Sequence, residues 1–398
     1  MNRRSFIKRS LFTLAATGMV PSLFSRTALA AGGNGKILVV FHLFGGNDVL
    51  NTLIPYGQSE YADYRPDIKI ATADILTLDA PGVTLGLHPA LDPLMTYWNN
   101  GQLALVNQVG YPHHNRSHFY STAVWNTADP DNVNKVGWLG PFIDEQNDPF
   151  CATNFGSTLP RALRGVHTSG LSIESIGSFS LGTSDWEEQL RNELLRQIQT
   201  ARSGTAEEVR RGMEHMLRSI EKVQEMGTVE NTVTFPSTGP GRRFAEIAKM
   251  IKGDFPAQVY YSATGGYDTH SGQGGATGAH ANLLSDLAGA LDAFMREMSA
   301  IGKDGDVMVL VFSEFGRRAK QNASAGTDHG KGGVMFVLGG TVNGGVYGGE
   351  PALAEEALDD GDVPVKVDFR SAYAAAANFI GANPAELVGP GFDPLPLI

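Results

Sequence analysis

The sequence has one cysteine, fewer basic than acidic residues and no long apolar run after its first 30 residues. The lone Cys151 cannot form an internal disulfide, which fits a chain that folds in a reducing compartment, and it is expected to be a small buried side chain. A formal net charge of -11 excludes the basic surface that nucleic-acid binding requires. Without a later apolar segment of sufficient length, no transmembrane anchor is expected in the processed chain.

The first 30 residues have the order of a twin-arginine export signal. The pair Arg3-Arg4 precedes a moderately apolar stretch over 11–23, and a small-residue cleavage site follows over 28–30. A basic amphipathic anchor is the alternative, and the order of the three features argues against it. We therefore predict cleavage after residue 30, export by the twin-arginine machinery and a periplasmic or secreted mature chain. Because this segment holds five basic residues and no acid, its removal takes the net charge from -11 to -16.

Short apolar runs rich in valine recur along the remaining chain and predict strands that are buried on both faces. These runs cover 36–41, 103–106, 259–261, 307–312 and 334–338. Apolar residues at helical spacing over 280–301 predict a helix that packs on the sheet. Further helices are expected over 87–99, from Ser117 onward and around 244–251. The predicted fold is a three-layer α/β/α sandwich with a mostly parallel central sheet, formed as a single domain by residues 31–398.

A charged stretch over 185–228 interrupts this alternation. Its acidic and basic side chains have the pattern of solvent-exposed helices. We predict a helical insertion there, which forms a lid or an interaction surface.

Side chains of the types that bind metals lie near the beginnings or ends of these predicted strands. They are Asp48, Asp268, His270, Glu314, Asp328 and His329. Open α/β sheets place their sites at the carboxyl edge of the strands, and carboxylates with imidazoles suit zinc or a similar ion. A metal site is therefore predicted at that edge. For Asp48, an Asx turn or a helix cap is the alternative.

Ser117 opens a predicted helix in a segment with three histidines and Arg116. The N-terminus of a helix has free N–H groups and a favourable dipole, which stabilise a developing alkoxide and a bound anion. Ser117 is therefore a candidate nucleophile. The alternative is that it only caps the helix.

Taken together, these motifs resemble the alkaline phosphatase and sulfatase superfamily. More narrowly, F-S-E-F-G-R-R, G-T-D-H-G and G-G-Y-D-T-H are similar to the signatures of an exported bacterial family known as domain of unknown function 1501. The resemblance extends from about Lys36 to the C-terminus, and the charged segment over 185–228 matches it least. It implies an alkaline-phosphatase-like fold.

The resemblance also implies roles for individual residues. Asp48 and Glu314 would bind one metal ion, and Asp268, His270 and His329, with Asp328 nearby, would bind a second. Ser117 would be the nucleophile, and Arg116 or Arg317 would pair with a phosphate or sulfate oxygen.

Two departures from the superfamily pattern stand out. Glu314-Phe315 replaces an aspartate-histidine pair, so one expected imidazole is missing, and His42, His114 or His118 would substitute for it. No C-x-P-x-R or S-x-P-x-R motif is present, so the formylglycine nucleophile of sulfatases is not expected.

Two functions follow from these observations. The first is an exported metal-dependent hydrolase acting on a phosphate or sulfate ester, with a small anionic ester or an envelope glycan or lipid as substrate. Zinc is the first expectation for the metal, with manganese, magnesium or calcium as alternatives. The second is a non-catalytic, metal-stabilised binding or structural protein of the cell envelope, because a shared fold does not prove shared chemistry.

Overall fold

The computed structural model describes residues 34–179, 189, 192–193, 196 and 220–398. The predicted export signal over 1–30 and most of the predicted insertion over 185–228 lie outside these residues. Among the residues described, no helix is long and apolar enough to cross a membrane.

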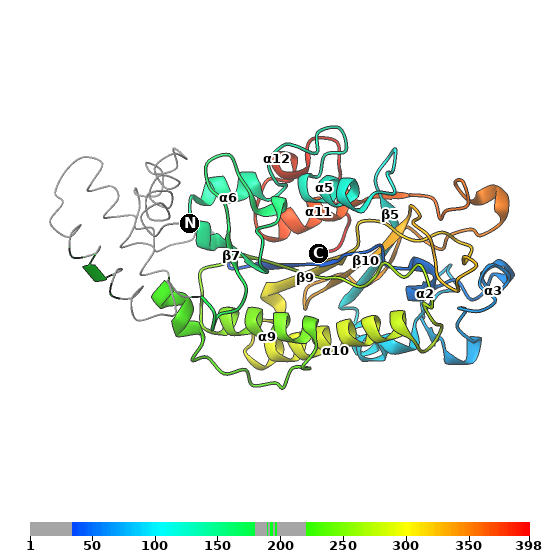
Figure 1. The fold of residues 1–398 in the computed structure, drawn as a ribbon, viewed down its shortest axis with the longest axis horizontal. Coiled ribbons are helices and arrows are strands. Elements are labelled where there is room, and N and C mark those ends of the chain that lie inside the picture. The colour runs from blue at the N-terminus through cyan, green and yellow to red at the C-terminus, as the bar shows by residue number, and fades with distance from the viewer. Residues whose placement is uncertain (1–33, 180–188, 190–191, 194–195, 197–219) are drawn as a thin grey trace, which may run out of the picture.

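A nine-stranded sheet forms the centre of the molecule (Figure 1). Eight strands lie in the order β11-β5-β10-β9-β1-β8-β6-β7, and β12 pairs with β5. The strands are β1 (Ile37–Leu43), β5 (Leu103–Gly110), β6 (Ala152–Phe155), β7 (Leu171–Ile173), β8 (Val259–Thr264), β9 (Val307–Phe312), β10 (Gly333–Leu338), β11 (Gly345–Tyr347) and β12 (Val367–Asp368). All pairs are parallel except those of β10, which runs antiparallel to both β9 and β5. The mostly parallel sheet predicted from the valine-rich runs is confirmed.

The sheet is apolar on both faces because alternate residues of each strand enter different cores. In β1, Val39 and Phe41 belong to one core and Leu38 and Val40 to the other, and all four are fully buried. β1 itself lies between β8 and β9. The middle of this central strand is therefore apolar, and its one polar side chain, His42, lies near its carboxyl end.

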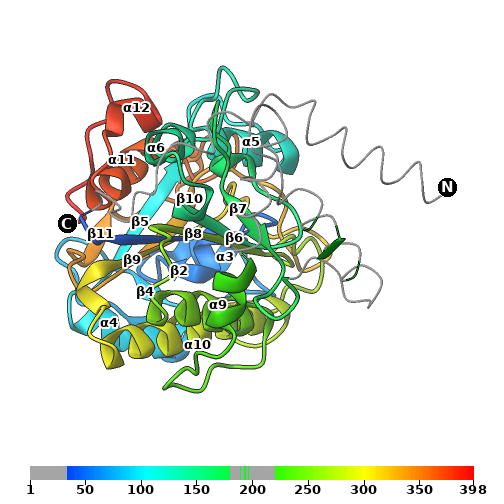
Figure 2. The same ribbon diagram turned by 90° about the vertical axis from the view of Figure 1, so that its left-hand side faces the viewer.

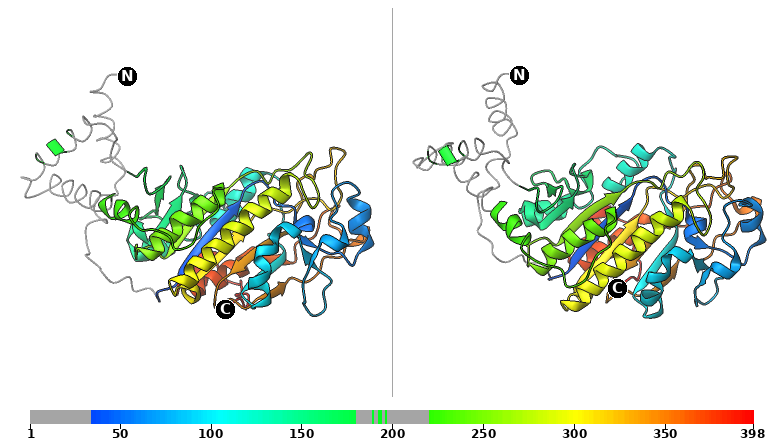
Figure 3. Two further views of the ribbon diagram at one scale, coloured as in Figure 1. Left: turned by 90° about the horizontal axis from the view of Figure 1, so that it is seen from below. Right: turned by 60° about the horizontal axis from the view of Figure 1, so that its bottom comes forward.

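Helices cover both faces of the sheet, which confirms the three-layer sandwich (Figure 2). One face is covered by α4 (Met95–Asn99), α9 (Gly239–Lys252) and α10 (Ala279–Ala300), and Figure 3 shows α9 and α10 lying along it. The other face is covered by α5 (His118–Thr127), α6 (Gly140–Gln146), α11 (Phe369–Phe379) and α12 (Pro384–Val388). Near one end, α2 (Val49–Thr52), α3 (Ser59–Tyr64) and a small sheet of β2 (Leu53–Ile54), β4 (Gly86–Leu87) and β3 (Leu76–Thr77) complete the fold.

The helix predicted over 87–99 differs from the structure. Leu87 lies in β4, a 3-10 helix follows over Pro89–Leu94, and only Met95–Asn99 is α-helical. Pro93 lies inside the 3-10 segment. Proline has no N–H to donate and its ring crowds the preceding turn, so a regular α-helix does not form there.

Candidate metal centre

Four chain segments meet at the carboxyl edge of the parallel strands. The loop after β8 contains Asp268 and His270, the loop after β9 contains Glu314, and His329 shortly precedes β10. Because β10 is antiparallel to β9, its beginning lies at the edge where β9 ends. The fourth segment is the start of α5 with His118. The topology thus brings together residues that are up to about 200 positions apart.

Three histidines surround the carboxylate of Asp268. His270 Nε2 is 3.0 Å and His329 Nε2 is 3.1 Å from Asp268 Oδ1, and His118 Nε2 is 3.4 Å from Asp268 Oδ2. Ligand atoms of His118, Asp268 and His329 all lie within 4.8 Å of one another. His270 joins this group through a separation of 2.9 Å between its Nε2 and that of His329. These four residues are called the ligand cluster below.

Each of these histidines uses its other ring nitrogen to contact an atom that can only accept a hydrogen bond. His118 Nδ1 lies 2.6 Å from Glu314 Oε1, and His270 Nδ1 lies 3.0 Å from Asp328 Oδ1. His329 Nδ1 lies 2.8 Å from the backbone oxygen of Arg116. Since ionised carboxylates and carbonyls do not donate, each Nδ1 can donate its proton outward, which leaves the Nε2 of a neutral ring as the atom that can bind a cation. Metal-binding histidines typically have such outer partners.

The ligand cluster fits a divalent cation. Two imidazole lone pairs 2.9 Å apart repel each other unless a proton or a cation lies between them. His118 Nε2 is buried and has no hydrogen-bond partner. Ligand atoms about 2.0–2.1 Å from a tetrahedral zinc ion are about 3.3–3.4 Å apart, close to the separations of 3.0–3.4 Å between the histidines and Asp268. His118, Asp268 and His329 are therefore suitable donors within reach of one ion, and His270 lies beside Asp268 and His329.

The electrostatics keep Asp268 ionised. Burial acts to raise the pKa of Asp268, but the hydrogen bond from Arg317 and the contact with His329 outweigh it, and the pKa falls to about 2. Arg317 Nη2 lies 2.6 Å from Asp268 Oδ1. Burial lowers the pKa of His329, which favours the neutral ring that a metal requires. The hydrogen bond to Glu314 raises the pKa of His118 in the metal-free chain.

Glu314 and Asp328 contact the Nδ1 atoms of the histidines rather than the Nε2 atoms that face Asp268. Glu314 Oε1 accepts from His118 and from Gly45 N at 2.9 Å, and Glu314 Oε2 lies 3.1 Å from His42 Nε2. Burial acts to raise the pKa of Glu314, but the hydrogen bonds from His118 and His42 keep it well below its usual range. Asp328 Oδ1 accepts from Asn322 at 3.0 Å as well as from His270.

Asp48 is not among the residues that meet in the ligand cluster. Its two oxygens lie 2.5 and 2.9 Å from the guanidinium nitrogens of Arg65, and Gln273 Nε2 donates to it at 2.5 Å. Both Asp48 and Arg65 are fully buried. Arg65 therefore supplies the positive charge beside Asp48.

The two predicted catalytic residues, Arg116 and Ser117, directly precede His118 in the sequence. Ser117 is exposed, is the N-cap residue of α5 and makes no side-chain capping bond. It stands between Arg116, whose carbonyl contacts His329, and His118. The guanidinium of Arg116 pairs with Asp362 and, at 3.1 Å, with Asp360. The other predicted anion partner, Arg317, is buried and donates to backbone oxygens of residues 45, 46, 267 and 327 besides Asp268.

His118 was one of three histidines proposed to replace the imidazole missing at Phe315, and the sequence alone could not choose among them. The structure places His118 in the ligand cluster, whereas His42 contacts the other oxygen of Glu314 and stacks on Phe312. The Phe315 ring lies 4.8 Å from the rings of both His118 and His329. Phe315 is therefore an apolar neighbour of both imidazole rings.

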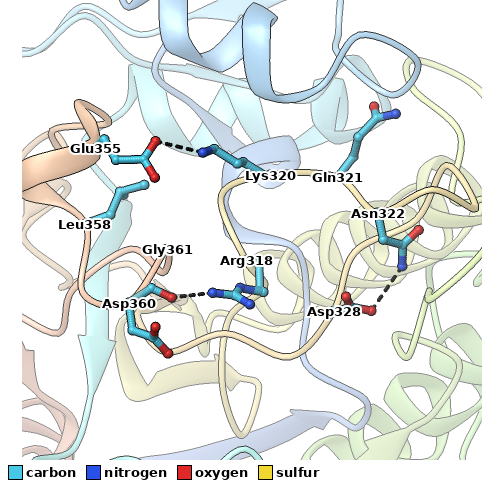
Figure 4. A pocket seen from close by; sticks show the side chains of 9 residues that line it. All are labelled: Arg318, Lys320, Gln321, Asn322, Asp328, Glu355, Leu358, Asp360 and Gly361. Carbon is cyan, nitrogen blue, oxygen red and sulfur yellow. Dashed lines mark hydrogen bonds and ion pairs between the residues drawn. The ribbon is translucent and has the colours of Figure 1, made fainter.

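A polar hollow of about 500 Å³ adjoins this centre (Figure 4). Asp328 lines the hollow and also contacts His270, so this residue borders both the hollow and the ligand cluster. Figure 4 shows the pairs that cross it, which include Lys320 with Glu355 at 2.7 Å and Asn322 with Asp328 at 3.0 Å. Its lining has charges of both signs and one apolar side chain, Leu358. It could therefore accept a polar group attached to whatever binds at the metal centre.

The fold and the site define a three-layer α/β protein with a candidate centre for one metal ion. The family model described as "Protein of unknown function (DUF1501)" matches residues 185–387, just over half of the sequence, and the chain belongs to this family. The matched region contains Asp268, His270 and His329 and does not reach Ser117 and His118. It also includes the whole of the charged segment over 185–228.

No curated protein matches the sequence. Among solved structures, the C-terminal periplasmic domain of EcEptC from Escherichia coli in complex with zinc has a TM-score of 0.40 and 12% identity, covering 91% of this chain and 89% of that one. A protein in the alkaline phosphatase superfamily from Vibrio parahaemolyticus has a TM-score of 0.36 and 11% identity, covering 89% and 68%. The alkaline phosphatase of the Antarctic bacterium TAB5 has a TM-score of 0.32 and 10% identity, covering 78% and 94%.

Proposed function

We propose that this protein is an exported, metal-dependent hydrolase of phosphate or sulfate esters. One observation carries the proposal: three imidazoles direct their Nε2 atoms at the Asp268 carboxylate, and an exposed serine directly precedes one of them in the sequence. Such a set of donors is costly to assemble without a cation, and an open side toward solvent distinguishes catalytic metal sites from closed structural ones. Asp268 and His270 provide that open side, with side chains that are 45% and 44% exposed.

In the proposed mechanism, His118, Asp268 and His329 hold the ion, and His270 completes the set. A bound divalent ion supplies charge neutralisation for the non-bridging oxygens of the ester. Ser117 attacks the phosphorus or sulfur atom, forms a covalent ester and displaces the alcohol, and water then cleaves that ester. The first turn of α5 contributes N–H groups that have no intrahelical acceptor, and these favour an anion beside Ser117.

The lining of the hollow beside the metal centre indicates which kind of substrate would fit. Its charged and amide side chains suit a polar alcohol portion, such as the sugar or head group of an envelope glycan or lipid. Arg318 and Lys320 supply positive charge in its wall, although each also contacts an acceptor of the protein. An envelope substrate would also agree with the predicted export of the chain.

A second candidate function is a metal-stabilised binding or structural protein without turnover. The observation that favours it is the buried pair of Asp48 and Arg65. If an arginine takes the position of one of the two ions that the resemblance implies, a two-metal displacement mechanism is not available.

Hydrolysis assays with defined metals distinguish the two functions. The mature protein is treated with a chelator and then given zinc, manganese, magnesium or calcium separately, with 4-nitrophenyl phosphate and 4-nitrophenyl sulfate as substrates. The expected result is release of nitrophenol with at least one ion and none in the chelated protein. A protein that binds metal tightly but hydrolyses neither ester with any ion would support the binding protein instead.

A further inference from the structure

The side-chain amide of Gln273 joins the two loops that contribute most of the ligand cluster. Gln273 Oε1 accepts from Thr269 Oγ1 and from Thr327 Oγ1, both at 2.8 Å. Thr269 lies between Asp268 and His270, and Thr327 lies two residues before His329. One carbonyl oxygen therefore binds a residue next to the ligands of each loop.

The orientation of this amide is fixed by its third contact. Gln273 Nε2 lies 2.5 Å from Asp48 Oδ2, and an ionised carboxylate can only accept. The nitrogen must therefore face Asp48, which leaves the oxygen for the two threonine hydroxyls. Gln273 is fully buried, so water cannot replace these partners.

Asp48 is itself anchored by Arg65. All five N–H groups of Arg65 have acceptors: Asp48 Oδ1 and Oδ2, Asn51 Oδ1, and the backbone oxygens of Arg318 and Ala319. The last two oxygens belong to the segment that directly follows Arg317. A fully paired guanidinium in the interior is a rigid anchor, because moving it would expose several donors without partners.

The backbones of the two loops are also in contact, so small shifts between them matter. Thr327 N donates to Thr269 O at 3.0 Å. At Gly326, an added Cβ would lie 2.2 Å from the carbonyl carbon of His270. The loops therefore touch where the threonines bind Gln273, and loss of either hydroxyl bond would change how closely they pack.

We propose that Gln273 is a positioning residue for the metal centre. Held by the anchor of Asp48 and Arg65, it sets the distance between the loop that contains Asp268 and His270 and the loop that contains His329. This inference rests on the proposed metal site. Gln273 contacts none of the ligand atoms directly, and its effect passes through Thr269 and Thr327. Its loss should therefore change metal affinity and ligand geometry more than it changes the fold.

The first test removes the hydroxyl donors and keeps the side-chain shape. Thr269→Val, Thr327→Val and the double variant are compared with Thr153→Val, a matched control. Thr153 is fully buried in β6, and its hydroxyl has no hydrogen-bond partner. Affinity for zinc is measured by chelator competition, and the visible absorption of the cobalt-loaded protein reports the ligand geometry.

The second test reverses the donor and acceptor between residues 48 and 273. Gln273→Glu places two carboxylates in contact, and Asp48→Asn added to it restores a donor for the new carboxylate. The double variant should recover part of the metal affinity that Gln273→Glu loses. A residue with only a packing role would show no such recovery.

The expected result is a loss of zinc affinity on the order of 10-fold or more in the Thr269→Val and Thr327→Val double variant, with an altered cobalt spectrum. Thr153→Val should match the wild type in both. Unchanged affinity and an unchanged spectrum in the double variant would overturn the positioning role. Failure of the wild type to bind zinc or cobalt would overturn both the site and this role, whereas metal binding without ester hydrolysis would contradict only the proposed enzyme.

Discussion

The Ser117→Ala protein is expected to fold, to keep its metal and to lose ester hydrolysis by a factor of about 10³ to 10⁶. The large loss follows from covalent catalysis, because alanine offers no oxygen to attack the ester. The small effect on folding follows from the structure, in which the Ser117 side chain makes no capping bond to α5. The stability change should therefore be below the roughly 1 kcal/mol typical of a lost serine cap.

Ser271→Ala is the matched control for this change. Ser271 is also exposed and is directly adjacent to a ligand histidine, His270, but it does not open a helix. Its replacement should leave hydrolysis near the wild-type rate. If Ser117→Ala retains activity in the presence of the same metal, the nucleophile is not Ser117.

Arg65→Met is expected to destabilise the protein by about 3–5 kcal/mol, because it leaves the buried carboxylate of Asp48 without its partner. Burial acts to raise the pKa of Asp48, but Arg65 outweighs it and keeps the pKa below its usual range. Denaturant unfolding at neutral pH measures the loss. The control is Asp48→Asn with Arg65→Met, which should lose less because no charge remains unpaired.

The pH dependence of these variants follows from the same carboxylate. In the wild type the pKa of Asp48 is lowered, so the stability it contributes is present above the unfolded aspartate pKa of about 3.9 and is lost as the pH falls below it. In Arg65→Met, the guanidinium no longer offsets the effect of burial and the pKa of Asp48 should be raised, so the destabilisation should shrink as the pH falls from 8 toward 5. A destabilisation that stays constant over this range would contradict the account of the pair.

The sheet could be predicted from the sequence because its strands are continuous apolar runs with clear ends. Val307–Phe312 appears in the structure with the predicted bounds, and the helix predicted over 280–301 is observed as Ala279–Ala300. The antiparallel direction of β10 had no signal in its residues, since buried strands of both directions are similar in composition. The direction of β10 depends on the loop that connects it to β9, and the sequence predicts only that this loop is rich in glycine.

The candidate site was predicted in part. Asp268, His270, Glu314 and His329 were expected together because each lies near the end or beginning of a buried strand. Asp268, His270 and His329 are in contact, whereas Glu314 contacts His118 instead. The roles of Glu314 and Asp328 could not be predicted, because a carboxylate that binds a metal and one that orients a histidine look alike in a sequence. Nor could the pairing of Asp48 with Arg65, since it depends on where α3 ends in space.

Metal content tests the central claim most directly. The mature protein, purified without chelator and then supplied with zinc, is analysed for bound metal per chain together with His118→Ala and the control His167→Ala. His167 is exposed and lies outside the ligand cluster. The account predicts about one ion per chain in the wild type and in His167→Ala, and strongly reduced content in His118→Ala. No bound ion in the wild type, or equal content in all three proteins, would contradict it, and two ions per chain would contradict the role given to Arg65.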